Sequence, residues 1–275
     1  MQARRLPAIR GWNWIAEGFG LFRTNPALLT FLVFGYWLTL IFLNLMPLIG
    51  VVLAPLAVPA LSVGVMNGCR ALERKGDNGF GLLYSGFARN RNALFVLGGL
   101  YLAGSLAVFA ASALFDGGAL LGIMMAGQEP PEGLLHSDRL MMSLQITLAL
   151  MVPVMMAFWF APMLAAWDDV PPAKALFFSF IACLRNWRAF FAYTACALFF
   201  GGILPGILLG VLVAIVPGTA SVASTLFMLP LMFVLAPTLV ASFYVSYRDV
   251  FTDSELAVVT DETGDTPPPP PEDHA

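Results

Sequence analysis

The sequence predicts an all-α protein, a polytopic membrane helix bundle with six transmembrane helices and a short amphipathic interfacial helix before spans one, three and five. Hydrophobic residues make up 59% of the chain and charged residues 11%, whereas soluble domains carry about 45–50% and 25%. Several apolar runs reach the roughly 20 residues that cross a bilayer core of about 30 Å. The basic residues alternate between loops as they do in membrane proteins.

The expected spans form three closely spaced pairs. Pro47 and Gly50 interrupt the first apolar run after one span, and Pro217-Gly218 separates the last two spans. No Asp, Glu, Lys, Arg or His falls inside any span. The six spans are expected at residues 27–46, 51–68, 93–115, 141–167, 189–216 and 221–247.

The positions of lysine and arginine predict the orientation. In a six-span arrangement, 13 of the 14 basic residues fall on one side of the membrane, and Arg139 is the exception. Cytoplasmic loops carry the excess of basic residues, so both termini are expected in the cytoplasm. The loop 116–139 is then the sizeable outward segment.

The composition divides the chain into an apolar membrane domain and an acidic tail. Residues 1–250 form the expected membrane domain, built from three degenerate copies of an interfacial helix followed by a hairpin. Residues 251–275 are acidic and include five consecutive prolines, Pro267–Pro271. Such a tail cannot bury a core, so it is expected to be disordered and cytoplasmic. A motif for a proline-binding domain is the alternative interpretation.

Aromatic stripes at helical spacing precede spans one, three and five. Short helices in the membrane interface would explain them; the alternative is that they pack under the spans as core. The stripes are Trp12, Ile15, Phe19 and Phe22, then Phe80, Leu83, Tyr84 and Phe87, then Phe177, Phe180, Ile181 and Leu184.

An arginine closes each stripe at a matching junction. Each junction reads Arg-x-x-x-Ala followed by two large apolar residues, beginning at Arg23, Arg89 and Arg185. Arg91 and Arg188 lie within a turn of these junctions. Near an anionic leaflet each basic residue contributes about 1 kcal/mol, so these five arginines are candidate sites for lipid headgroups, including anionic ones. The alternative is that they only fix the topology.

The aromatic stretch 12–22, the junction Arg-Thr-Asn-Pro-Ala at residues 23–27 and the proline-bearing second span carry a family resemblance. The chain resembles a broad, largely uncharacterised group of bacterial inner-membrane proteins, which are similar to the multi-span domain attached to some glycerophosphodiester phosphodiesterases. The resemblance implies a multi-pass protein of the bacterial cytoplasmic (inner) membrane. It implies no activity, because the phosphodiesterase catalytic domain has no counterpart here.

The sequence offers no constellation typical of catalysis. Cys69, Cys183 and Cys196 are an odd number without paired spacing, and His136 and His274 lie far from them. A metal site needs a cluster of such ligands, and an enzyme needs a nucleophile with a base. We therefore expect no enzyme activity, no cofactor, no metal and no nucleic-acid partner.

Three glycines repeat every four residues in the fifth span, at Gly202, Gly206 and Gly210. This spacing places them on one helix face, where another backbone can approach closely. The neighbour could be another span or a second copy of the chain, so self-association through span five is one expectation. The favoured function is a non-enzymatic scaffold that organises lipids or partners. A carrier for a small apolar or amphipathic solute is the alternative, and a cavity lined by small residues and open to one face would favour it.

Overall fold

A computed structural model of the chain describes residues 3–46, 49–76, 79–120, 122, 138–215 and 220–251. All elements in these ranges are helices. They are α1 Arg10–Thr24, α2 Pro26–Asn44, α3 Gly50–Glu73, η1 Phe80–Phe87, α4 Arg91–Asp116, α6 Asp138–Trp159, α7 Ala161–Trp167, α8 Pro172–Arg185, α9 Trp187–Leu198, η3 Phe199–Ile203, α10 Leu204–Ile215 and α11 Ala220–Phe251. The proline-rich tail and most of the outward loop lie outside the described residues.

Six helices or helix pairs are long and apolar enough to cross a membrane, which agrees with the six expected spans. They are Pro26–Asn44, Gly50–Glu73, Arg91–Asp116, Leu140–Trp167, Trp187–Ile215 and Ser224–Phe251. Two differ from the expected single helices: α6 and α7 meet at a break at Phe160, and the π-helix η3 interrupts the fifth span. Pro205 follows η3 and lacks the N–H that a regular helix needs at that point.

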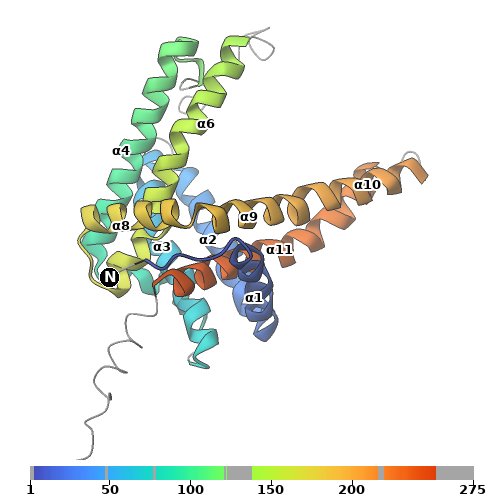
Figure 1. The fold of residues 1–275 in the computed structure, drawn as a ribbon, viewed down its shortest axis with the longest axis horizontal. Helices are drawn as coiled ribbons and strands as arrows, with labels where there is room; N and C mark the ends of the chain where they lie inside the picture. The colour runs from blue at the N-terminus through green and yellow to red at the C-terminus, as the bar shows by residue number, and fades with distance from the viewer. Residues whose placement is uncertain are drawn as a thin grey trace, which may run out of the picture.

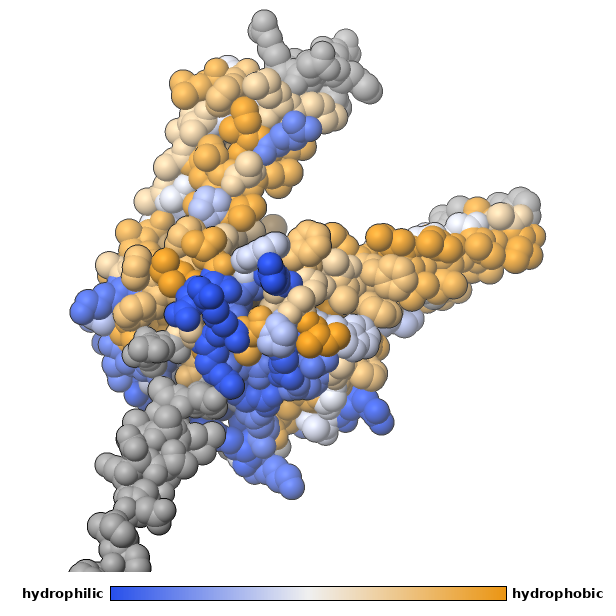
Figure 2. All heavy atoms as spheres, viewed as in Figure 1, coloured by the Kyte–Doolittle hydropathy of each residue, from blue (hydrophilic) through white to orange (hydrophobic). Residues whose placement is uncertain are grey.

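The spans form three hairpins that diverge from a common hub. Figure 1 shows α4 and α6 running in one direction and the arm of α9, α10 and α11 in another, with α2 and α3 near the point where they meet. Figure 2 shows that the two arms are covered by hydrophobic residues, whereas hydrophilic residues gather at the hub. The apolar arms are therefore the parts that belong in the hydrocarbon of a bilayer.

A short helix precedes each hairpin, and each of the three packs on a different hairpin from the one it precedes. Helix η1 packs on α2 and α3, and α8 packs chiefly on α6. Helix α1 packs on α9 and α11. Each short helix thus lies against the hairpin before it in the chain, and α1 closes the ring by packing on the last hairpin. This arrangement joins the three hairpins at the hub.

Small residues let the short helices approach the spans closely. A Cβ atom at Gly18 of α1 would lie 2.6 Å from the backbone nitrogen of Ser242 in α11. A Cβ atom at Gly64 of α3 would lie 1.9 Å from the carbonyl oxygen of Leu83 in η1. In α8 the buried face consists of Ala175, Ser179, Ala182 and Cys183. Close backbone packing of this kind is how membrane helices associate.

The aromatic stripes were expected either to lie in the membrane interface or to pack under the spans as core. The structure buries some of their side chains and exposes others. Ile15 and Phe22 of α1 are buried, whereas Trp12 and Phe19 are about two-fifths exposed. In α8, Phe177 is 60% exposed. Each short helix therefore buries one face in the hub and exposes aromatic residues on the other, and placement of that exposed face in the membrane interface stays a prediction.

Candidate functional site

The five predicted headgroup arginines are all exposed, and they lie where a short helix turns into the next span. Arg23 is in the last turn of α1, and Arg185 ends α8. Arg89 pairs with Asp169 at 3.1 Å, in a bridge exposed on both sides. The structure does not bring these arginines into one pocket, because the three junctions lie on different hairpins. The exposed residues are Arg23, Arg89, Arg91, Arg185 and Arg188.

Aromatic rings support two of these arginines. The Arg23 guanidinium lies 6.0 Å from the centroid of the Phe19 ring, and that of Arg188 lies 5.5 Å from Trp187. Both rings are among the exposed hydrophobic side chains. Aromatic residues with arginine at one level are typical of the membrane interface.

The glycine face of the fifth span meets no other part of the described chain. A Cβ atom at Gly202, Gly206 or Gly210 would have nothing within 4 Å. This span is also the least buried of the six, since 6% of its most apolar stretch lies inside the protein. The described helices therefore supply no neighbour for this face, and self-association through it stays a prediction.

A network of charged side chains at the hub was not predicted from the sequence. Asp249 of α11 accepts hydrogen bonds from Arg10 Nε at 2.7 Å and from Trp14 Nε1 at 2.9 Å. Arg10 also pairs with Glu17 at 3.0 Å. Burial lowers the pKa of Arg10, but the hydrogen bond to Asp249 and the charges of both carboxylates outweigh this effect, so its pKa is raised. Arg10 therefore stays charged.

Arg248 extends this network to the first hairpin. It pairs with Glu17 at 2.6 Å and with Glu73 at the end of α3. The Tyr244 hydroxyl donates to Glu73 at 2.5 Å. Helices α1, α3 and α11 are thereby tied together by ionic hydrogen bonds in partly buried surroundings, where such bonds are stronger than in water.

A second set of polar contacts joins α7 to the rest of the hub. Trp167 Nε1 donates to Asn67 Oδ1 at 2.8 Å, and Asn67 donates in turn to Ser85 Oγ of η1 at 2.8 Å. The Tyr247 hydroxyl donates to Asp168 at 2.6 Å. Arg70 lies with its guanidinium 5.0 Å from the Trp167 ring centroid.

One signal in the sequence points to this network. An acidic residue stands at the end of each even-numbered span: Glu73, Asp168 and Asp249. Together with the short helices, these ends meet in the hub. The sequence could show the repetition, but it could not show which arginine each carboxylate contacts.

The break between α6 and α7 is stabilised by one hydroxyl. Phe160 N and Met156 O are four residues apart and would bond directly in a regular helix. Instead, Ser179 Oγ of α8 accepts from Phe160 N at 2.9 Å and donates to Met156 O at 2.8 Å. Insertion of a side chain into the helical ladder is a known cause of a kink, and Pro162, two residues after Phe160, has no N–H to donate.

The kink places Phe160 in the centre of an aromatic cluster. Its ring centroid lies 6.0 Å from that of Phe190, 6.0 Å from that of Phe243 and 5.3 Å from that of Phe251. Phe160 is fully buried. The preceding Trp159 instead lines the space where the hairpins diverge.

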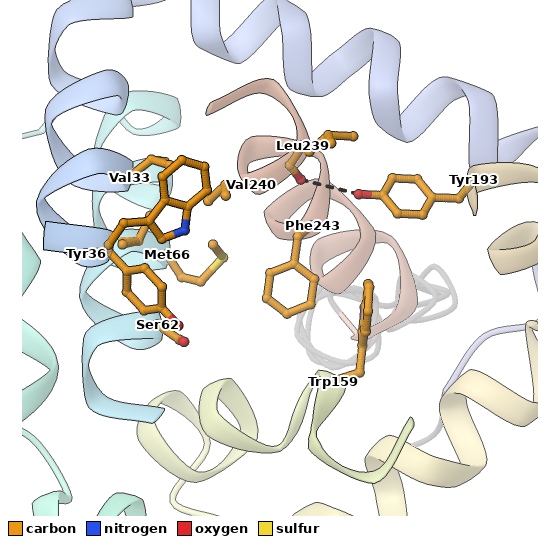
Figure 3. A pocket seen from close by; sticks show the side chains of 11 residues that line it. Val33, Tyr36, Ser62, Met66, Trp159, Tyr193, Leu239, Val240 and Phe243 are labelled. Carbon is orange, nitrogen blue, oxygen red and sulfur yellow. Dashed lines mark hydrogen bonds between the residues drawn. The ribbon is translucent and has the colours of Figure 1, made fainter. Parts of the chain in front are cut away.

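Two adjoining cavities occupy that space. One, of about 320 Å³, is lined by α2, α3, α6, α9 and α11, and another, of about 330 Å³, is lined by α2, α3, α4, α6, α7 and α11. Both are lined by Tyr36, Ser62, Trp159 and Phe243. Figure 3 shows Tyr36 and Ser62 on one side of the first cavity and Phe243, Trp159 and Tyr193 on the other. Large aromatic side chains dominate the lining, rather than the small residues that the carrier interpretation called for.

Two observations on the described residues concern metal binding and thiol chemistry. They include no group of three or more His, Cys, Asp or Glu side chains that could hold a metal ion. Burial raises the pKa of the Cys183 thiol to about 12. This thiol is therefore protonated near neutral pH and is a poor nucleophile.

Comparison with known proteins places the chain among inner-membrane proteins. It is 38% identical over 257 residues to a protein named "Probable inner membrane protein" from Burkholderia thailandensis, and the match covers 91% of this chain and 94% of the relative. No protein-family model and no solved structure matches the chain. The comparisons do not support the likeness to the domain attached to glycerophosphodiester phosphodiesterases. The six apolar spans indicate a multi-pass membrane protein. The identity to the relative shows that the chain belongs to the same inner-membrane protein family as the Burkholderia protein.

Proposed function

We propose that the chain is a non-enzymatic inner-membrane protein that organises lipids around three diverging hairpins. The observation that carries the proposal is the divergence itself, because it leaves apolar helix faces without protein neighbours. Large side chains are exposed along the arms, such as Leu148 at 61%, Leu198 at 62% and Leu226 at 71%. In a bilayer the space between these faces cannot hold water favourably, so acyl chains fill it.

The junction arginines supply the second half of the proposal. With the hub on the cytoplasmic side, as the distribution of basic residues predicts, the five arginines lie at the level of the inner-leaflet headgroups. Their guanidinium groups are exposed, and an arginine binds a phosphate through two parallel hydrogen bonds. The protein would thus hold phosphate headgroups at three junctions around the hub and acyl chains between the arms.

A triple replacement tests the headgroup sites. Lysine at positions 23, 89 and 185 keeps the charge and the topology signal but loses the bidentate geometry. We expect fewer anionic lipids to co-purify with this variant, counted by native mass spectrometry. Arg74→Lys is the control, because Arg74 is exposed and lies outside the three junctions.

Equal lipid retention by the triple variant and the wild type would contradict the headgroup proposal. The arginines would then act as topology signals that any basic residue could replace. Loss of lipid from the Arg74→Lys control as well would indicate a general effect of surface charge, and this outcome too would contradict specific sites.

The carrier alternative has one observation in its favour, the pair of cavities where the hairpins diverge. A carrier must expose its site in turn to both sides of the membrane. A lipid-organising protein would instead keep the same space in contact with the bilayer.

A further inference from the structure

The side chain of Trp159 lines both cavities, and its indole N–H is buried without a hydrogen-bond partner. Among the described residues, two buried side-chain polar atoms have no hydrogen-bond partner, Ser105 Oγ and Trp159 Nε1. Trp159 lines both cavities, whereas Ser105 lines neither. Buried donors are nearly always paired in folded proteins, because an unpaired one loses the hydrogen bond it makes to water. An indole N–H in this position is suited to a ligand that carries an acceptor.

The Trp159 ring is held firmly. It packs edge-on against Phe190, with ring centroids 5.6 Å apart, and against Phe243, with centroids 5.2 Å apart. It also stands directly before the break that Ser179 stabilises. The indole N–H therefore has a fixed position, and a fixed donor binds with a smaller loss of conformational entropy.

Uncharged hydroxyls surround the same space. The Tyr36 and Ser62 hydroxyls lie beside each other on the opposite wall (Figure 3), and Tyr101 lines the second cavity. No Asp, Glu, Lys, Arg or His lines either cavity. The lining thus contains uncharged polar side chains and has no charge to pair with a charged headgroup.

The depth of this site in the membrane further restricts the class of ligand that the site can hold. Tyr36 comes ten residues after the start of α2 at Pro26, or about 15 Å along a helix that rises about 1.5 Å per residue. That distance is half of a hydrocarbon core about 30 Å thick. A charged group at this depth without a partner is costly, so the ligand's polar group must be neutral.

We propose that the two cavities form one site for an uncharged, long-chain amphiphile. A hydroxyl or ester carbonyl oxygen of this ligand accepts a hydrogen bond from Trp159 Nε1, near Tyr36 and Ser62. Its chain runs outward between the apolar hairpins. The two cavities, of about 320 and 330 Å³, are of the size that usually holds a small molecule. This site goes beyond the proposed function, which concerns phosphate headgroups at the junctions and acyl chains between the arms, because it binds a neutral polar group inside the bundle.

Photocrosslinking tests the site in the full-length protein. A monoacylglycerol with a diazirine in its acyl chain is the probe, and labelled peptides are mapped by mass spectrometry. We expect saturable labelling of peptides from α3, α6 and α11 that line the cavities. Unlabelled monoolein should compete, whereas oleate, which is charged at neutral pH, and hexadecane, which has no acceptor, should compete at least tenfold more weakly.

A matched pair of variants tests the donor. Trp159→Phe removes the indole N–H and keeps an aromatic ring, and we expect about five- to tenfold weaker competition by monoolein, the range of one hydrogen bond. Trp12→Phe makes the same change at a more exposed position outside the cavities and should leave competition unchanged. Competition by the three ligands in the wild type keeps the test decisive if Trp159→Phe does not fold.

Three results would overturn the proposal. Labelling that does not saturate would show that bulk lipid fills the space. Equal competition by oleate or hexadecane would remove the selectivity for a neutral acceptor. Equal affinity in Trp159→Phe and Trp12→Phe would remove the role of the indole. None of these results depends on the junction arginines, so lipid retention by the arginine variant remains an independent measurement.

Discussion

Ser179→Ala should destabilise the hub, because it leaves two backbone groups without partners at the break between α6 and α7. The Ser179 hydroxyl is fully buried and bonds Phe160 N and Met156 O at 2.9 and 2.8 Å. A buried donor or acceptor left unsatisfied costs about 1–3 kcal/mol. The helix cannot easily straighten to restore the direct bond, since Phe160 is fixed among the aromatic rings of the hub. Two such groups lose their partner here, so we expect a loss of about 2–6 kcal/mol.

Ser246→Ala is the matched control for this experiment. Ser246 is 2% exposed, but its Oγ donates at 2.7 Å to Phe243 O within its own helix. That carbonyl keeps its helical N–H partner, so the cost should stay below about 1 kcal/mol.

The assay is reversible unfolding by sodium dodecyl sulfate in mixed micelles, followed by circular dichroism. Hydrogen exchange of the Phe160 amide provides a local measurement, and this amide should exchange faster in Ser179→Ala than in the wild type. Equal free energies of unfolding for the two alanine variants, with unchanged exchange at Phe160, would refute the reasoning.

Three further results are expected. Gly64→Ala should cost about 1–3 kcal/mol by overpacking, because the new methyl would meet the Leu83 carbonyl oxygen at 1.9 Å; wild-type stability in the detergent assay would contradict this close packing. Gly206→Leu should leave the monomer's melting temperature unchanged or raise it, since nothing lies within 4 Å and leucine favours helix over glycine. A lower melting temperature or a smaller oligomer by light scattering would show that this face packs on a second copy. Reporter fusions after Gly76 should behave as cytoplasmic and those near Gln128 as periplasmic, and a cytoplasmic signal near Gln128 would overturn the orientation.

The glycine repeat in the fifth span is a feature whose neighbour could not be inferred from the sequence. Gly202, Gly206 and Gly210 have the spacing of a packing motif, yet no described part of the chain lies against them. Among the glycines that do pack closely, Gly18 and Gly86 sit in short helices and Gly64 sits in α3, and each meets the backbone of another helix. Spacing places residues on one helix face, but it does not say what that face meets.

The sequence by itself determined the six spans, their pairing into hairpins and the positions of the junction arginines. These features depend on the local density of apolar residues and on which loops carry charge, and both can be read along the chain. The tertiary structure decided what joins the hairpins. Contacts such as Arg10 with Asp249 and Tyr244 with Glu73 link residues more than 170 positions apart. The cavity beside Trp159 likewise arises only where three hairpins converge, because its walls come from segments with no local pattern in common.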